Sequence, residues 1–419
     1  MNSTTLSSTA SRFEIPANAP AAARSALKLL LKLRHDALTV QFPDGSMHRF
    51  GDHDPSALHA TLMLRNWHIF SASLKSGDIG FAETYIAGDW STPSLTDLIK
   101  VFISNRVVIE DAIYGTWAGR LLFRIKHLLN RNSKTNSKKN IHAHYDLGNA
   151  FYEMWLDNTK NYSSALFEKG MDHTSYEGMV QAQHAKVRRA LNMADVKAGD
   201  RVLEIGCGWG ALAEKATTEF NASVVGVTLS TEQLDYANER MQKLGTADKA
   251  DLRLQDYRDI GKTTPDAPFD AICSIEMVEA VGQAYWPEYF QTVARLLKPG
   301  GYACIQSIVI ADDLFERYIG STDFIQQYIF PGGCLPCPKE FRAQARAAGF
   351  EVADEFSFGQ DYARTLQLWR EDFVAQESHV LQLGFDKRFI RIWEFYLSDC
   401  EAAFTEANTD VVQYTLRKV

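Results

Sequence analysis

The stretch Val202–Gly210, with the sequence VLEIGCGWG, constrains the fold of this chain more than any other. Residues Arg201–Ile205 are predicted to form a short apolar strand, and the helical pattern of Ala211–Phe220 follows the last glycine directly. Glycine has no Cβ, so a strand that enters a helix through a glycine-rich turn lets bare backbone approach a nucleoside ligand. The alternative is a tight turn between strand and helix that binds nothing.

The glycines of this turn alternate, which separates it from the turns of dinucleotide-binding proteins. Its pattern is Gly-x-Gly-x-Gly after an acid, whereas dinucleotide binders carry Gly-x-Gly-x-x-Gly. An acid followed by three alternating glycines is the usual opening of methyltransferases that use S-adenosylmethionine. We therefore expect contacts with that cofactor from Glu204, Gly206, Cys207, Gly208 and Gly210.

Strand patterns and helix patterns alternate downstream of this turn. Strands are predicted at 223–228, 251–254, 269–275, 302–310 and 351–358, and helices at 231–244, 285–296, 339–348, 366–377 and 388–405. This alternation is typical of an α/β protein with a doubly wound, Rossmann-like parallel sheet. In such sheets ligands bind at the carboxyl ends of the strands, so the residues just after each strand are the candidates for function.

Three of these strand ends carry polar side chains. After the second strand, Thr228, Ser230 and Gln233 could bind ribose hydroxyls by neutral hydrogen bonds, and Ser230 or Thr231 could equally act as a plain helix cap. After the third strand, an acid, an aromatic residue and a base follow one another, and they could hold the adenine amine and face: Asp256, Tyr257 and Arg258.

The fourth strand is followed by two carboxylates, Glu276 and Glu279, three residues apart. On a helical turn they would share one face. The alternative is the solvated start of a helix.

The length of 419 residues favours two domains. Residues 1–23, rich in Ser, Thr and Ala, are predicted to be a disordered tail, and 24–129 a smaller N-terminal α+β domain. Residues 130–140 (NRNSKTNSKKN) have no apolar side chain and are predicted to be a basic linker, which could also touch anionic headgroups. Residues 141–419 form the second domain. The amphipathic stretch Ser25–Leu33 could lie on a membrane surface or pack on its own domain.

Composition excludes some classes of function. The net charge of −8 offers no general argument for nucleic acid binding. No apolar run approaches the roughly 20 residues that a membrane-spanning helix requires, and no secretory signal is visible, so a cytoplasmic protein is expected. Cys334-Leu-Pro-Cys337 lacks a second pair and is interpreted as a loop, with no metal site expected.

Several passages beyond the glycine turn make the chain resemble the cyclopropane fatty acid synthases and mycolic acid methyltransferases. The resemblance extends over Ile141–Phe404 and is carried by HYDLG at 144–148, NYS at 161–163, GCGWG at 206–210, GVTLS at 226–230, QDYR at 255–258, YIFPG at 328–332 and Asp361-Tyr362. More weakly, Gly88-Asp-Trp90 and Leu95–Ile99 resemble the N-terminal lipid-binding domain of the bacterial synthases. The resemblance implies a class I methyltransferase fold, S-adenosylmethionine as cofactor, and unsaturated phospholipid acyl chains as substrate at the inner membrane surface. A homodimer is plausible by the same resemblance.

The family's mechanism assigns roles to particular positions. The cis double bond of an acyl chain attacks the sulfonium methyl, a carbocation forms on the chain, and loss of a proton closes a ring. By resemblance, cofactor contacts come from Tyr162, Ser163, Thr228, Leu229, Ser230, Gln233, Tyr257 and Arg258. Glu279 and Tyr362 match the active-site glutamate and tyrosine. Cys400 matches a cysteine once proposed as catalytic, and we interpret it as part of the wall because this chemistry needs no thiol.

The chain departs from the family where the bacterial synthases hold bicarbonate as their base. Ser164 replaces the cysteine of that shell, Gln306 a histidine, and Ala280 the histidine after the glutamate. Glu276 replaces a glycine. Bicarbonate is therefore a doubtful cofactor here, and the chain would belong to a divergent branch.

Two hypotheses follow from these departures. Glu276 replaces bicarbonate as the base, with its pKa raised by burial beside Glu279. Alternatively, the cation rearranges by hydride shift and gives a methyl-branched or methylene chain, which the apparent dismantling of the anion site slightly favours. Two other classes stay open: an inactive membrane-associated protein that binds S-adenosylmethionine, and a small-molecule methyltransferase.

Overall fold

The computed structural model describes residues 13–113, 147–262, 266 and 268–419. The chain divides into two compact units, residues 1–116 and 117–419, which are described separately. This division falls before the predicted linker 130–140, which lies outside the described residues. The predicted boundary near residue 129 is thus later than the division between the units.

The first unit is an α+β domain with a small sheet of order β2-β1-β3-β4. Strand β1 pairs antiparallel with β2 and parallel with β3, and β3 pairs antiparallel with β4. A hairpin around Pro43-Asp44-Gly45 joins β1 to β2. The elements are α1 (Ala21–Leu30), β1 (Ala37–Gln41), β2 (Met47–Gly51), β3 (His59–Leu64), α2 (His68–Ala87), β4 (Trp90–Ser91), α3 (Leu95–Ser104) and α4 (Arg106–Ile113).

The predicted tail 1–23 extends too far. Helix α1 begins at Ala21 rather than at the predicted Ser25, because three consecutive alanines favour a helix. Phe13 also packs, with its ring centroid 5.1 Å from that of Phe50. Residues 13–23 therefore belong to the folded unit.

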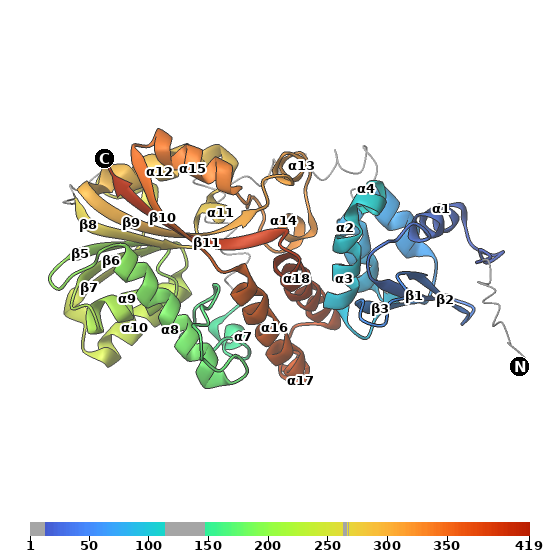
Figure 1. Ribbon diagram of the computed structural model, residues 1–419. Coiled ribbons are helices and arrows are strands. Elements are labelled where there is room, and N and C mark those ends of the chain that lie inside the picture. The colour runs from blue at the N-terminus through green and yellow to red at the C-terminus, as the bar shows by residue number, and fades with distance from the viewer. Residues whose placement is uncertain (1–12, 114–146, 263–265, 267) are drawn as a thin grey trace, which may run out of the picture. The chain divides into compact units, whose positions relative to one another are not determined.

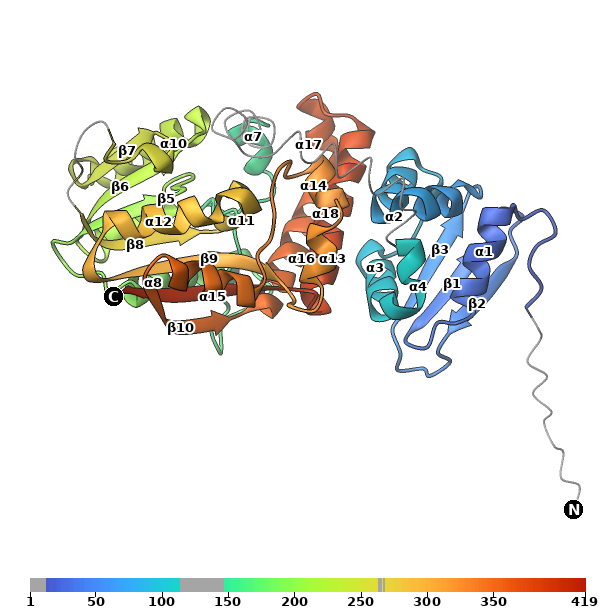
Figure 2. The ribbon, with the colours of Figure 1, turned by 90° about the horizontal axis from the view of Figure 1, so that it is seen from above.

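The second unit contains a seven-stranded sheet of order β10-β11-β9-β8-β5-β6-β7. Helices α8, α9 and α10 lie on one face and α12 and α15 on the other, which confirms the doubly wound α/β fold (Figure 1). Figure 2 shows the same layers from above. The strands are β5 (Arg201–Ile205), β6 (Ser223–Thr228), β7 (Ala250–Leu254), β8 (Phe269–Ile275), β9 (Leu297–Ile310), β10 (Phe350–Ser357) and β11 (Thr409–Lys418).

The helices of this unit follow the predicted pattern, and most bounds differ from the predicted ones by two residues or fewer. Helix α16 begins at Gly359, seven residues before the predicted 366. The helices are α7 (Asn149–Tyr152), α8 (Tyr176–Met193), α9 (Ala211–Thr218), α10 (Thr231–Leu244), α11 (Val278–Val281), α12 (Trp286–Leu296), α13 (Phe315–Ile319), α14 (Phe324–Tyr328), α15 (Pro338–Ala347), α16 (Gly359–Ala375), α17 (Glu377–Gln382) and α18 (Lys387–Thr405), with 3₁₀ turns at Ala247–Lys249, Tyr257–Asp259 and Gln283–Tyr285.

Strand β11 was not predicted, and it is the antiparallel member of the sheet. It pairs antiparallel with both β9 and β10. Its run from Val411 to Leu416 is buried throughout, as expected for a strand covered on both faces. A short apolar run that is buried on both faces cannot be identified as a strand by periodicity alone.

The core of the second unit lies on both faces of this sheet. One apolar cluster includes Leu203, Phe290 and Phe341, and a second includes Ala190, Leu212 and Cys273. Within the described ranges, no helix combines the length and the apolar character needed to span a bilayer.

Candidate active site

The glycine turn after β5 has the backbone that its sequence predicts. Gly206, Gly208 and Gly210 all have positive φ, of 85°, 49° and 84°, a region that glycine enters without strain. A Cβ added to Gly206 would lie 2.5 Å from Met277 Cγ, whereas one added to Gly208 would meet nothing within 4 Å. The turn therefore packs against the end of β8 on one side and leaves open space beside Gly208.

Glu204 and Cys207 flank this turn and are both buried. Glu204 Oε2 has no hydrogen-bond partner among the described residues. Burial raises the pKa of Glu204 well above its usual value, and Lys186 and Arg240 oppose that rise. Glu204 thus keeps unused hydrogen-bonding capacity next to the glycine turn.

The residues after β6 form a compact turn of neutral side chains. Thr228 Oγ1 lies 3.0 Å from Gln233 Oε1, and Gln233 N donates to Ser230 Oγ at 3.3 Å. Ser230 is the N-cap of α10, as the capping alternative predicted, and Leu229 is half-buried. The cap and a role in ribose binding are compatible, because Thr228, Ser230 and Gln233 stand together at the carboxyl end of β6.

The charged side chains of the turn after β7 pair with each other. Arg258 donates to both carboxylate oxygens of Asp256, at 2.9 and 2.6 Å, and its guanidinium lies over the Tyr257 and Tyr285 rings. Tyr257 is buried against Tyr289. The Asp256 carboxylate that we expected to hold an adenine amine is thus already engaged by Arg258.

Tyr162 and Ser163 lie in the segment that leads to α8. Tyr162 OH is 2.8 Å from Tyr396 OH on α18. Ser163 Oγ accepts a short hydrogen bond from Lys186 Nζ, which also donates to Asn161 Oδ1 at 3.3 Å. The segment is therefore held by α8 and α18 together.

Lys186 is a functional candidate that the sequence analysis missed. Its side chain is fully buried on α8, and burial lowers its pKa to about 8, against the opposing influence of Glu276, Asp157 and Glu204. One signal was visible in the sequence: Lys186 stands on the stripe of α8 that carries Ala182, Ala185 and Ala190, where an apolar residue is expected.

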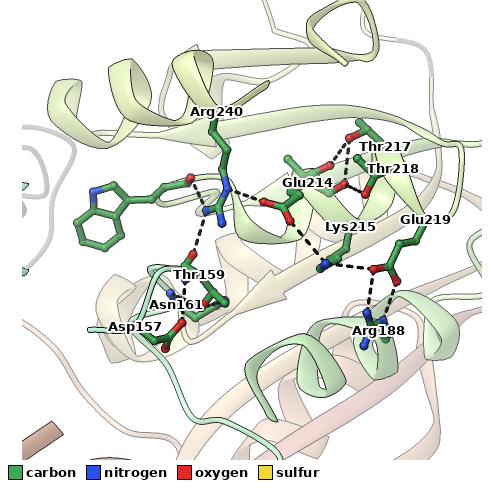
Figure 3. Close-up of polar contacts among 12 residues, drawn as sticks. Asp157, Thr159, Asn161, Arg188, Glu214, Lys215, Thr217, Thr218, Glu219 and Arg240 are labelled. Carbon is green, nitrogen blue, oxygen red and sulfur yellow. Dashed lines mark hydrogen bonds and ion pairs between the residues drawn. The ribbon is translucent and has the colours of Figure 1, made fainter. Parts of the chain in front are cut away.

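A ladder of ion pairs links the glycine turn to the neighbouring helices (Figure 3). Arg240 of α10 donates to Thr159 O at 2.9 Å, to Trp209 O at 3.2 Å and to Glu214 Oε2 at 2.6 Å. Lys215 then bridges Glu214 to Glu219, which pairs with Arg188 of α8. Arg240 thus joins the glycine turn to the segment that carries Tyr162 and Ser163.

Glu276 occupies the centre of the residues that replace the family's bicarbonate shell. Its Oε1 accepts from Ser164 N at 3.0 Å and from Gln306 Nε2 at 2.8 Å, and its Oε2 accepts from Tyr362 OH at 2.7 Å. The anion site is thus occupied by a carboxylate of the chain itself rather than dismantled. Ala280, at the family's second histidine position, is exposed.

The two carboxylates do not share a helical face, contrary to the prediction. Glu276 precedes α11 with a φ of 53°, a left-handed conformation that is uncommon for a residue with a Cβ. Glu279 lies within α11 and accepts a short hydrogen bond from Ile308 N. The left-handed residue turns the two carboxylates toward different partners.

The carboxyl groups of Glu276 and Glu279 differ in their electrostatic surroundings. Burial and the neighbouring Glu276 raise the pKa of Glu279 to about 8. Burial also raises the pKa of Glu276, but Lys186, Ser164, Tyr362 and Gln306 all oppose that rise. Near neutral pH Glu279 therefore holds a proton, and Glu276 is the member better supported as an anion.

The surroundings of Tyr362 and of Cys400 keep both groups protonated. Burial and Glu276 raise the pKa of Tyr362 well above its usual value, so its hydroxyl remains a donor. Burial, Asp399 and Asp323 likewise raise the pKa of the Cys400 thiol. A thiol with a raised pKa is a poor nucleophile, and the interpretation of Cys400 as wall stays a prediction.

The residues present fit S-adenosylmethionine but not bicarbonate. Open space beside Gly208 and the unpartnered buried oxygen of Glu204 suit a nucleoside ligand that carries an ammonium group. The donors that would hold bicarbonate, Ser164 N, Gln306 Nε2 and Tyr362 OH, are already bonded to Glu276.

Comparisons with known proteins identify the family of this chain. Residues 132–414 match the family model described as mycolic acid cyclopropane synthetase. The tuberculostearic acid methyltransferase UfaA1 of Mycobacterium tuberculosis is 34% identical over 412 residues, covering 96% of this chain and 93% of that protein. The cyclopropane-fatty-acyl-phospholipid synthase of Escherichia coli is 33% identical over 347 residues, covering 82% and 84%.

A solved structure shares the fold of the second unit. The mycolic acid cyclopropane synthase CmaA1, complexed with SAH and CTAB, superposes with a TM-score of 0.61 at 30% identity. The match covers 67% of this chain and 98% of that one.

Proposed function

The chain belongs to the mycolic acid cyclopropane synthetase family, and we propose that it methylates unsaturated phospholipid acyl chains. In this proposal Glu276 is the base that removes a proton from the methylated chain. As a member of this family the protein is an S-adenosylmethionine-dependent methyltransferase that modifies fatty acyl chains. The identity of the base, the product and the site of action on a membrane are the proposal.

One observation carries the assignment of the base. Three donors, Ser164 N, Gln306 Nε2 and Tyr362 OH, converge on the Glu276 carboxylate within 2.7 to 3.0 Å. The donors fix the position of the carboxylate and favour its anion, whereas burial raises the pKa of Glu276 above its usual value. A positioned carboxylate with a raised pKa suits a general base. The chain thus supplies from its own sequence the group that relatives take from solution.

The residues around Glu276 divide the work of the reaction. Bound S-adenosylmethionine supplies an electrophilic methyl group to the double bond of the acyl chain. Glu276 accepts the proton that the resulting cation loses, and Tyr362, Ser164 and Gln306 hold its carboxylate in place. The aromatic rings of Tyr162 and Tyr362 suit a cationic chain.

Glu276 can serve either product. Removal of a proton from the added methyl of the first cation closes a cyclopropane. After a hydride shift, removal of a proton from that methyl leaves a methylene group, and removal of a neighbouring chain proton leaves a methyl-branched alkene. The relative matched over 96% of this chain is named for methyl transfer rather than for cyclopropane formation. This name supports the second product, a methyl-branched or methylene chain.

The first unit supports action at a membrane surface. Leu31 and Val107 are 52% and 83% exposed, and both border a hollow of about 540 Å³ that Lys32 and Arg34 also line. Exposed apolar side chains beside cations suit the boundary between acyl chains and anionic headgroups. We propose that this surface contacts the lipid, with the enzyme peripheral to the membrane.

The test uses purified enzyme, vesicles of cis-monounsaturated phospholipid and cofactor deuterated in its methyl group. A product that takes up hydrogen is expected, with three retained deuterons for a methyl-branched alkene and two for a methylene group. Two retained deuterons with no hydrogen uptake would instead establish a cyclopropane. No label in the lipid would contradict the proposal and favour a membrane protein that binds the cofactor without turnover.

The surface of the first unit has a separate test. Val107→Asp places a charge at an exposed apolar position and should weaken binding to anionic vesicles, while turnover of detergent-dispersed lipid stays unchanged. Met47→Asp, at another exposed apolar position in the first unit, is the matched control. Equal vesicle binding by Val107→Asp and wild type would contradict the assignment of this surface.

A further inference from the structure

A row of polar side chains crosses the sheet behind Glu276. Gln306 of β9 and Gln413 of β11 are paired in register on adjacent strands, and neither is exposed. Buried amides are costly unless their hydrogen bonds are made. Gln413 has no role in the mechanism proposed above, so the burial of its amide has to be explained in another way.

The row forms a continuous chain of hydrogen bonds. Arg189 Nη1 of α8 donates to Gln413 Oε1 at 2.8 Å, Gln413 Nε2 donates to Gln306 Oε1 at 3.0 Å, and Gln306 Nε2 donates to Glu276 Oε1 at 2.8 Å. At its outer end, Arg189 pairs with Asp354 of β10 at 2.8 Å. The chain thus reaches from the β10 edge to the carboxyl end of β8.

Every hydrogen bond in this row has its donor on the side of Arg189 and its acceptor on the side of Glu276. A guanidinium has donors only, whereas a primary amide has a donor end and an acceptor end. Because Arg189 must donate, Gln413 turns its oxygen toward Arg189 and its nitrogen inward, where Lys186 O also accepts at 3.2 Å. Gln306 must then turn its oxygen toward Gln413 and its nitrogen toward Glu276.

We propose that Arg189 and Gln413 are positioning residues that hold the donor end of the Gln306 amide toward the Glu276 carboxylate. This inference rests on the proposed role of Glu276 as the base. The reversed amide would present its oxygen to that carboxylate. An ionised carboxylate repels this oxygen, whereas a protonated carboxyl group can donate a hydrogen bond to it. The relay therefore favours the form of Glu276 that can accept a proton.

Other groups around Glu276 act on the same equilibrium. Lys186 on α8 and the Tyr362 hydroxyl on α16 favour the anion, and Glu279 on α11 disfavours it. Gln413 is not hydrogen-bonded to these three side chains, and its hydrogen bond with Lys186 is to the backbone carbonyl. Because Gln413→Glu also brings a charge near Glu276, the uncharged Gln413→Leu is compared with it to isolate the contribution of the relay.

Gln413→Glu is the sharpest test, because it keeps the shape and the acceptor for Arg189 but removes the inward donor. Gln306 then has to reverse its amide to donate to the new carboxylate. The ascending limb of the pH profile of kcat/KM is expected to move up by about one pH unit, since a carboxylate that loses a donor has a higher pKa. Turnover should fall about tenfold below the limb and recover above it.

Companion variants separate positioning from folding. Gln413→Leu removes the donor without a new charge and should shift the limb in the same direction. Arg189→Lys keeps a donor and should leave the limb near its wild-type position, whereas Arg189→Met should move it upward. Arg342→Met removes a guanidinium that pairs with Glu355 on the same strand β10 and should leave the limb unchanged. Thermal midpoints and SAH affinity are measured for each variant.

The outcomes distinguish this inference from the function it rests on. A limb that stays in place in Gln413→Glu and Gln413→Leu, with turnover either lowered uniformly or unchanged, contradicts the relay. Glu276→Gln is assayed beside them. If it retains turnover, Glu276 is not the base. If it loses turnover while the Gln413 variants keep the wild-type limb, the relay alone fails.

Discussion

The two halves of the sheet edge that carries the site are built differently. On the cofactor half, side chains bond to near neighbours: Thr228 to Gln233, and Asp256 to Arg258. On the base half, Glu276 is held by Ser164, Gln306 and Tyr362, which lie 112, 30 and 86 positions away. Short motifs thus shape the cofactor half, whereas the base exists only once distant segments are folded together.

The largest effect is expected on the base half. Glu276→Gln keeps the size of the side chain but removes the group that accepts the proton, so turnover should fall by about 10³-fold. SAH affinity, measured by calorimetry, should stay unchanged because the cofactor half is intact. Glu351→Gln, at an exposed position of β10, is the matched control. Wild-type turnover in Glu276→Gln would remove Glu276 from the mechanism.

A smaller effect on the same half is expected from Tyr362→Phe. This change removes the donor to Glu276 Oε2, raises the pKa of Glu276 and moves the ascending limb of the pH profile upward by about one unit. Below the limb, turnover should fall about tenfold.

Tyr414→Phe is the control for Tyr362→Phe. The Tyr414 hydroxyl is buried without a hydrogen-bond partner in the described part of the chain, so its loss should cost little. A fall in turnover without a shift of the limb would show that Tyr362 contributes its ring rather than its hydroxyl.

Arg240→Met tests whether the cofactor half depends on more than local motifs. Without Arg240, the carbonyls of Thr159 and Trp209 lose their common donor, and the segment that carries Tyr162 and Ser163 loosens. Cofactor affinity should fall about tenfold, while turnover at saturating cofactor stays near that of wild type. Lys243→Met, which breaks an exposed pair on the same helix, is the control. Unchanged affinity would leave the cofactor half purely local.

The smallest effect concerns stability. The pKa of Glu279 is raised to about 8 in the folded protein, above its value in the unfolded chain. The folded state then binds the extra proton, so Glu279 costs stability progressively as the pH rises from about 4.5 toward 8. Glu279→Gln should therefore gain a thermal midpoint of roughly 3 °C relative to wild type between pH 5 and pH 8. A difference that does not vary with pH would mean that Glu279 is ionised in the fold.

The sequence predicted the cofactor half more completely than the base half. The strand before Gly206, the cap at Ser230 and the alternation of strands and helices are local patterns, and they are present in the structure as predicted. Lys186 and Gln413 were missed because each stands among other polar residues of its element, and the local pattern does not show which of them are buried. Whether such a residue is solvated, paired or catalytic depends on partners from other segments.

Glu276 shows the same limit at one residue. Its substitution for a glycine was visible, but the altered shell around it suggested an anion site that had been lost. The left-handed backbone at Glu276 and the pairing of β8 with β9 place its carboxylate within hydrogen-bond distance of Ser164 N, Gln306 Nε2 and Tyr362 OH. The replacements at Ser164, Gln306 and Glu276 looked like the loss of an anion site in the sequence. In the structure, the Glu276 carboxylate occupies that site and bonds to the other two residues.

The family, the cofactor class and the α/β architecture were determined by sequence alone, because the glycine turn and the strand ends act through backbone geometry and neighbouring residues. The tertiary structure decided the position of the unpredicted strand β11, the burial of Lys186 and the donors around Glu276. Those features depend on long-range packing, in which burial shifts a pKa and a distant donor sets the direction of a hydrogen bond.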